Sequence, residues 1–129
     1  MNEVLTLTFD QPDILEQIST FGQRELDDLD FGVIGFDADT VVRLYNAHES
    51  KLAGLSPHRV LGHPLFTVVA PCMNNFMVAQ RFEDAAAGAV TLDATINYVL
   101  TLRMRPLKVR LRMLAAPGKA LRYLLVHRQ

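Results

Sequence analysis

Residues 107–113 alternate strictly between apolar side chains and lysine or arginine, and this pattern limits the fold more than any other feature. A period of two puts successive side chains on opposite faces, so the segment predicts a β-strand with one buried and one solvated face. Residues 92–104 before it form a long apolar run, and residues 121–127 form another beyond a Pro-Gly turn. We therefore expect three antiparallel strands in the last third of the chain.

The preceding residues predict a hairpin followed by helices. Residues 31–36 and 41–45 are apolar, strand-like runs around a polar turn, which is typical of a β-hairpin. Asn46 is a candidate N-cap for a short helix over residues 47–53, and residues 76–87 carry apolar side chains at helical spacing. Two strands, several helices and three strands make an α+β fold, a five-stranded antiparallel sheet with short helices on one face.

Residues 1–28 differ from the rest and predict a helical N-terminal cap. Asp13 is a candidate N-cap for a helix whose apolar residues lie over 14–18, and an acidic segment follows over 25–30. We expect the cap to pack on the sheet, because its apolar positions need burial. The predicted division of the chain is therefore 1–28 for the cap and 29–129 for the main domain.

The composition is that of one globular domain in a reducing compartment. The chain has 129 residues, of which 50% are hydrophobic and 21% charged, and its formal net charge is −1. So small a charge gives no global attraction to nucleic acid or to a membrane, and we expect neither as a partner. The single cysteine forms no internal disulfide, the N-terminus lacks a signal-peptide pattern, and no apolar stretch approaches the ~20 residues of a membrane span. A cytoplasmic protein is the expectation.

Cys72 is the one unusual residue in this composition. A lone cysteine in an apolar loop is most often inert packing. Here a rigid apolar approach, Val-Ala-Pro, leads to Cys72, and the polar residues Asn74 and Asn75 follow. A thiol presented in this way could carry a covalent group, and the residues alone leave both interpretations open.

Tyr45 and Glu49 are four residues apart across a strand-to-helix junction. If Asn46 caps the helix, Glu49 falls on the first turn, close to the end of the strand that carries Tyr45. Two hydrogen-bonding groups could then converge on one point of a pocket. The alternative is that Glu49 is an exposed acid that stabilises the helix dipole.

Other chemistry is not indicated by the sequence. The four histidines lack metal-ligand spacing, and no phosphate-binding loop or nucleophile–base motif appears, so we expect no metal site and no enzyme. Basic side chains gather around one hairpin, and a solvated outer face of the sheet explains them. They are Arg103, Arg105, Lys108, Arg110 and Arg112.

Five short segments together carry a family resemblance. They are Phe31-Gly32-Val33-Ile34, Tyr45-Asn46-Ala47, Val60-Leu61-Gly62, Val69-Ala70-Pro71-Cys72 and Arg81-Phe82. In them the chain resembles the photoactive yellow protein family of bacterial blue-light receptors, which have the PAS fold, and the similarity runs from about Leu29 to the C-terminus. The Val-Ala-Pro-Cys segment is the specific part, because generic PAS domains lack that cysteine.

The resemblance implies a chromophore on Cys72. In the family, p-coumaric acid (4-hydroxycinnamic acid) is held on this cysteine as a thioester, and Tyr45 and Glu49 fall where two side chains hydrogen-bond its phenolate oxygen. A buried carboxyl beside an anion favours its neutral form, so Glu49 is expected to donate a hydrogen bond. After light-driven isomerisation Glu49 would give up its proton, and the buried carboxylate would loosen the N-terminal cap. The signal would pass to an unidentified signalling protein, from a monomer or weak homodimer.

Three further positions follow from the resemblance. Ala53 stands where the family has a threonine that supports the tyrosine–glutamate pair, and Leu55 where it has an arginine that shields the chromophore. Met104 falls where the family has a methionine linked to the return to the dark state. The losses at Ala53 and Leu55 keep an alternative open, a PAS sensory or interaction module that is not photoactive and has a small-ligand pocket. A redox or haem sensor with Cys72 as ligand ranks last, since no basic residue lies beside Cys72 in the sequence.

Overall fold

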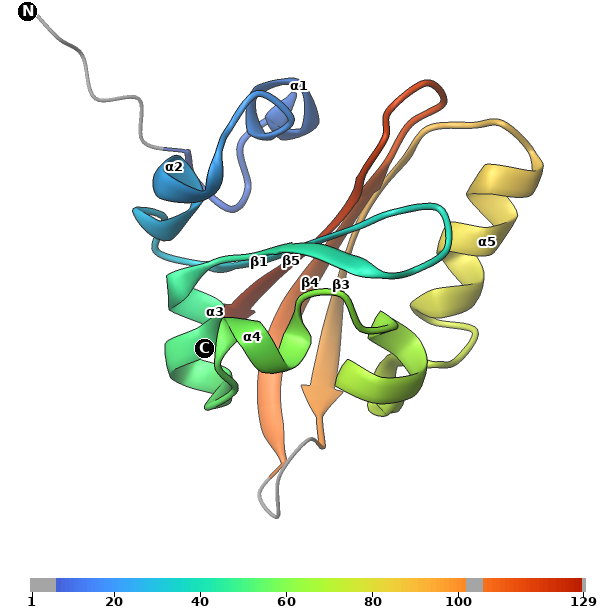
Figure 1. Cartoon of the computed structure of the whole chain (residues 1–129). Helices are drawn as coiled ribbons and strands as arrows, with labels where there is room; N and C mark the ends of the chain where they lie inside the picture. Colours follow the sequence, from blue (N-terminus) through green and yellow to red (C-terminus); the bar gives the residue numbers. More distant parts are fainter. Residues whose placement is uncertain (1–6, 102–105, 129) are drawn as a thin grey trace, which may run out of the picture.

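One antiparallel sheet of five strands forms the centre of the protein (Figure 1). The computed structural model describes residues 7–101 and 106–128. The strands are β1 Gly32–Phe36, β2 Val42–Tyr45, β3 Leu92–Leu100, β4 Leu107–Ala115 and β5 Arg122–Arg128. Their spatial order is β2-β1-β5-β4-β3, so the last strand lies in the middle. The predicted α+β fold with a five-stranded antiparallel sheet is confirmed.

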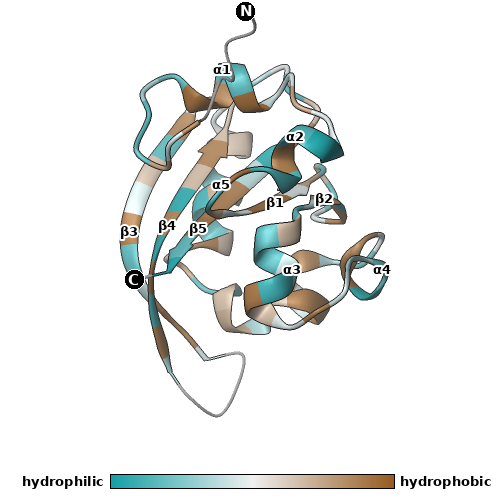
Figure 2. Cartoon of the chain, turned by 90° about the vertical axis from the view of Figure 1, so that its left-hand side faces the viewer, coloured by the Kyte–Doolittle hydropathy of each residue, from teal (hydrophilic) through white to brown (hydrophobic). Residues whose placement is uncertain are grey.

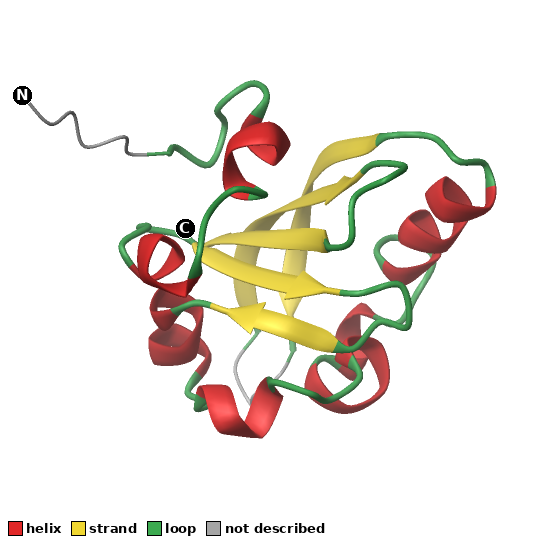
Figure 3. Cartoon of the chain, turned by 45° about the horizontal axis from the view of Figure 1, so that its top comes forward, coloured by secondary structure: helices red, strands yellow, loops and turns green. Residues whose placement is uncertain are grey.

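The helices are short and lie around the sheet (Figure 3). They are α1 Ile14–Ile18, α2 Gln23–Asp27, α3 Ala47–Ala53, α4 Pro57–Val60 and α5 Ala79–Ala87. A π-helical turn, Leu65–Val69, and a 3-10 turn, Pro71–Met73, lie between α4 and α5. Within the described residues, no helix combines the length and the hydropathy that crossing a bilayer requires.

Both faces of the sheet are covered, by different parts of the chain. Along β5, Leu124 and Val126 belong to the core that includes Phe82 of α5, whereas Leu125 belongs to a second core that includes Ile14 of α1. Figure 1 shows α1 and α2 lying together, well apart from α5. The N-terminal segment therefore packs on the sheet as expected. At the sheet edge, β3 is buried at its two ends and alternates exposed and half-buried residues between them, and Figure 2 shows hydrophobic and hydrophilic bands along it.

Asn46 joins the hairpin, α3 and the N-terminal segment. Its side-chain oxygen accepts hydrogen bonds from the backbone N–H of Glu49 at 3.1 Å, as an N-cap does, and of Val33 at 2.9 Å. Its amide nitrogen donates to the carbonyls of Leu26 and Phe31, both at 2.9 Å. The predicted N-cap is thus confirmed, and Asn46, which is fully buried, also fixes the position of α3 against β1.

Of two predicted helix starts, one is confirmed and one was wrong. Asp13 is the N-cap residue of α1 as predicted, although its φ of 59° is left-handed and its side chain makes no capping hydrogen bond. The helix expected from Phe76 begins at Ala79 instead, and Phe76 is 79% exposed rather than on the apolar face. The side-chain oxygen of Asn75 accepts hydrogen bonds from two backbone N–H groups just before this helix, which satisfies the chain there without another helical turn.

The outer face of β4 is less solvated than the alternation predicted. Arg112 is only 6% exposed, because the N-terminal segment covers it. Its guanidinium donates to the Asp93 carboxylate at 2.8 and 2.9 Å, and to the carbonyls of Phe9 at 2.9 Å and Gln11 at 2.8 Å. A solvated face was therefore the wrong interpretation of Arg112, which fastens the segment around residues 9–11 to the sheet.

Arg110 makes a second, more exposed link to the same segment. It donates two hydrogen bonds to the Asp10 carboxylate, at 3.1 and 2.8 Å, and its guanidinium carbon lies 4.9 Å from the centre of the Phe9 ring. Of the other basic residues in the predicted cluster, Lys108 is exposed on β4, and Arg103 and Arg105 lie outside the described residues.

Candidate ligand site

Cys72 lies on the turn Pro71–Met73, between the buried residues Ala70 and Met73. Its side chain is half-buried, and its thiol is free of any disulfide. It borders a cavity of about 800 Å³ that extends along β3 and β4, with Tyr98 in its wall. A thiol in this place is open to an acyl donor and also borders space that an attached group could occupy.

Two side chains hold the backbone of the Cys72 turn in place. The Tyr98 hydroxyl, on β3, donates to the Cys72 carbonyl at 2.6 Å. The Asn75 amide donates to the same carbonyl at 3.2 Å and to the Tyr98 hydroxyl oxygen at 2.7 Å. The backbone of the turn is therefore tied to the sheet by a closed set of three hydrogen bonds.

Tyr45 and Glu49 are both buried, at 1% and 3% exposure. Tyr45 ends β2, where it pairs with Ile34 of β1, and Glu49 lies on the first turn of α3. The alternative in which Glu49 is an exposed acid on the helix is wrong, because α3 turns this residue toward the sheet. The absence of a side chain at Gly32 makes room for it, since a Cβ there would collide with Oε1 of Glu49.

Arg128, at the end of β5, pairs with Glu49. The two terminal guanidinium nitrogens of Arg128 donate to the two carboxylate oxygens of Glu49, at 2.7 and 3.0 Å. The side chains are only 11% and 4% exposed, so the pair is shielded from solvent. The resemblance implied a neutral Glu49 that donates to a ligand, whereas here its carboxylate accepts from a cation.

The environment of Tyr45 keeps its hydroxyl protonated. Burial raises the pKa of Tyr45 well above its ordinary value of 10.0, the negative charge of Glu49 raises it further, and the charge of Arg128 opposes this. Among the hydrogen bonds between described residues, none uses the Tyr45 hydroxyl. The group is thus a neutral hydroxyl, which can act as a hydrogen-bond donor.

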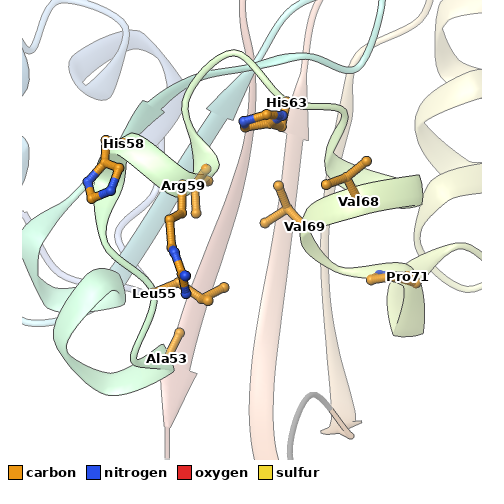
Figure 4. A pocket seen from close by; sticks show the side chains of 9 residues that line it. Ala53, Leu55, His58, Arg59, His63, Val68, Val69 and Pro71 are labelled. Carbon is orange, nitrogen blue, oxygen red and sulfur yellow. The ribbon is translucent and has the colours of Figure 1, made fainter.

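Ala53 and Leu55 lie on the wall of a second cavity, of about 710 Å³ (Figure 4). Val69 and Pro71 form its opposite wall, directly before Cys72. Arg59 of α4 also borders this cavity, and Figure 4 shows its side chain running toward Leu55. Small and apolar groups at residues 53 and 55 therefore leave an open space behind the cysteine turn.

The structure brings the predicted residues together in groups rather than at one point. Tyr45 and Glu49 form one group, Ala53 and Leu55 a second, and Cys72 borders a separate cavity. Met104 lies outside the described residues. Their roles toward a chromophore stay predictions.

Three side chains of the site were missed in the sequence, namely Arg128, Tyr98 and Asn75. Alternation along β5 could have indicated Arg128, because residues 124, 126 and 128 share a face. Nothing local in the sequence marks Tyr98 or Asn75, whose contact with Cys72 depends on how the turn meets β3.

Comparison with known proteins now decides the family. The PAS fold family model matches residues 26–129. The chain is 36% identical over 107 residues to photoactive yellow protein from Rhodothalassium salexigens, covering 83% of this chain and 85% of the relative. The chain belongs to the photoactive yellow protein family. The relative from Halochromatium salexigens, also named photoactive yellow protein, is 33% identical over 105 residues, covering 81% and 83% of the two chains.

A solved structure agrees with this membership of the photoactive yellow protein family. The photoactive yellow protein domain of the sensor histidine kinase Ppr from Rhodospirillum centenum superposes with a TM-score of 0.80 at 36% identity. The match covers 88% of this chain and 98% of that domain. The predicted family resemblance is therefore confirmed, and the boundary between residues 28 and 29 stays a prediction.

Proposed function

We propose that this chain is a blue-light receptor that carries p-coumaric acid as a thioester on Cys72. The observation that carries the proposal is the half-buried Cys72 thiol, set on a fixed turn beside a cavity in a chain of the photoactive yellow protein family. Tyr45 supports it, because its buried, protonated hydroxyl has a hydrogen bond to offer. When bound, the p-coumaroyl group would supply the absorption of light and a double bond that isomerises.

The chain's own residues would bind and orient this group. Cys72 holds it covalently, and Tyr98 with Asn75 fix the turn from which it projects. Tyr45 donates to its oxygen, in a place that the surrounding core keeps dry. A hydrogen bond from Glu49 to this group would require a change in its present pairing, since Arg128 already binds both of its carboxylate oxygens. The output would be a conformational signal to another protein.

Loading of the purified protein tests the proposal. A p-coumaroyl thioester donor should acylate the Cys72 sulfur, forming its bond to the acyl carbon and releasing the donor thiol. We expect the intact mass to rise by one p-coumaroyl group in the wild type and not at all in Cys72→Ala. An equal gain in Cys72→Ala, or no gain in either protein, would remove the basis of the proposal.

A second function is a PAS sensory module that binds a small ligand without photochemistry. The cavity beside Ala53 and Leu55 favours it, because it is open and has Arg59 at its wall. The same loading experiment separates the two functions, since this module would bind ligands reversibly and show no mass gain at Cys72.

A further inference from the structure

We propose that Arg128 is a positioning residue of the ligand site, which competes with the ligand for the carboxyl group of Glu49. In this arrangement Glu49 hydrogen-bonds a ligand only when its pair with Arg128 opens or weakens. The effect on the ligand rests on the proposed function, whereas the pairing itself is a property of the chain.

The sheet places Arg128 on the face that packs against the core containing Tyr45. Side chains of β5 alternate, so Leu124, Val126 and Arg128 share one face. Leu124 and Val126 belong to the same core as Tyr45, while Leu125 between them belongs to the core under the N-terminal segment. Arg128 therefore faces Tyr45 and Glu49, although it is far from both in the sequence.

The geometry of the pair is that of a specific interaction. Two parallel hydrogen bonds of 2.7 and 3.0 Å between a guanidinium and a carboxylate form the bidentate arrangement that arginine makes best. Both side chains are nearly excluded from solvent, at 11% and 4% exposure, so losing either partner would leave the other charge buried and unpaired. Gly32 adds to the fit, because any larger residue would occupy the space of the Glu49 carboxylate.

The guanidinium of Arg128 also has one hydrogen-bond donor that is unpaired among the described residues. Nε of Arg128 is buried and has no hydrogen-bond partner among the described residues. A buried donor without an acceptor is destabilising, so this position favours an additional acceptor. A ligand oxygen near Tyr45 would supply one, which is a second reason to place Arg128 in the site.

Few other charged groups face Glu49 in the described part of the chain. Tyr45 comes from β2 and Arg128 from β5, and Gly32 on β1 contributes no side chain. From α2, the Asp27 carboxylate accepts from the backbone N–H of Ala47 at the start of α3. Arg128 is thus the cation that meets the Glu49 carboxylate in the described part of the chain.

Infrared spectra of the apoprotein test the pairing directly, with Glu49→Gln to assign the Glu49 bands. We expect carboxylate bands from Glu49 in the wild type at neutral pH and in Arg128→Lys. In Arg128→Gln the buried acid lacks a cation, so the C=O band of a protonated carboxyl should appear. Two results would overturn the proposal. One is a protonated Glu49 in the wild type, which can be observed even if Arg128→Gln fails to fold. The other is a Glu49 carboxylate that persists in folded Arg128→Gln.

The loaded protein tests the competition by the sign of a pH shift. In Arg128→Gln, a protonated Glu49 can donate a hydrogen bond to the ligand's oxygen and so stabilise the phenolate. In a pH titration, the midpoint of the visible phenolate band should therefore move to lower pH, to a proton concentration at least about tenfold higher than in wild type. If Arg128 acted only through its positive charge, its removal would disfavour the phenolate, and the midpoint would move to higher pH instead. Arg128→Lys should restore the wild-type midpoint, and Arg43→Gln, which removes a 55% exposed arginine, should leave it unchanged.

The two proposals fail in different ways. If no variant takes up the chromophore, the proposed function fails while the infrared spectra still judge the Arg128–Glu49 pair. If loading succeeds and the midpoint in Arg128→Gln is unchanged or moves to higher pH, the competition is wrong and the photoreceptor function stands.

Discussion

At the scale of single residues, the position of Glu49 depends both on the missing side chain at Gly32 and on the cation at Arg128. Gly32 lets the Glu49 carboxylate lie against β1, and no other residue type leaves that space. Glu49 in turn has a partner only because β5 continues as far as Arg128. The pattern of glycine, acid and arginine thus works as one unit, although its members come from three different elements.

Replacing Gly32 by alanine should destabilise the protein by about 1–3 kcal/mol, the usual cost of overpacking a filled site. The added Cβ would force Glu49 away from its position and weaken its pair with Arg128. Urea denaturation of Gly32→Ala measures the effect. The matched control is Gly88→Ala, whose Cβ would meet its nearest neighbour at 3.4 Å and should change stability little. Equal effects of the two substitutions would contradict this account.

At the scale of elements, local signals in the sequence predicted most of the fold. The hairpin, the Asn46 cap and the three C-terminal strands depend on short-range patterns, and the structure confirms them. Arg112 and Arg128 show where such reasoning stops. Both lie in strands that were correctly predicted, but their partners are remote in the sequence. Arg112 binds the carbonyl of Phe9, about a hundred residues away, and Arg128 binds Glu49, about eighty residues away.

Asn46→Ala should lower the free energy of unfolding by about 3 kcal/mol or more, because it leaves two buried N–H groups and two carbonyls without their hydrogen-bond partner. Asn46→Asp keeps the acceptor for Val33 and Glu49 but buries an unpaired carboxylate against the carbonyls of Leu26 and Phe31, so its loss of stability should be at least as large. Thermal or urea unfolding of both variants measures the difference. Unchanged stability in either variant would contradict this account of Asn46.

The N-terminal segment should loosen at low pH. The hydrogen bond from Arg110 lowers the pKa of Asp10 below its ordinary value of 3.8. A group whose pKa is lower in the folded state stabilises that state above the unfolded pKa, and this contribution is lost as the pH falls through the lowered value. Hydrogen-exchange protection of the Gln11 amide, which donates to the Thr8 carbonyl, should therefore fall below about pH 4. Asp10→Asn should remove this pH dependence, and protection that changes equally in that variant would speak against the role of Asp10.

At the scale of the whole molecule, β5 connects the two halves of the protein. It lies between β1 and β4, with Arg128 paired to Glu49 on one face and Leu125 facing the N-terminal segment on the other. A change in the pairing of Glu49 therefore acts on a strand that both cores share.

Illumination of the loaded protein tests the central claim most directly. The visible absorbance would be recorded before, during and after blue light, at a pH where the phenolate band is fully developed. Our account predicts that the band decreases in the light and returns in the dark, and that Cys72→Ala treated in the same way shows no such band. A wild-type protein that carries p-coumaric acid on Cys72 but keeps its absorbance unchanged under illumination would contradict the assignment as a light receptor.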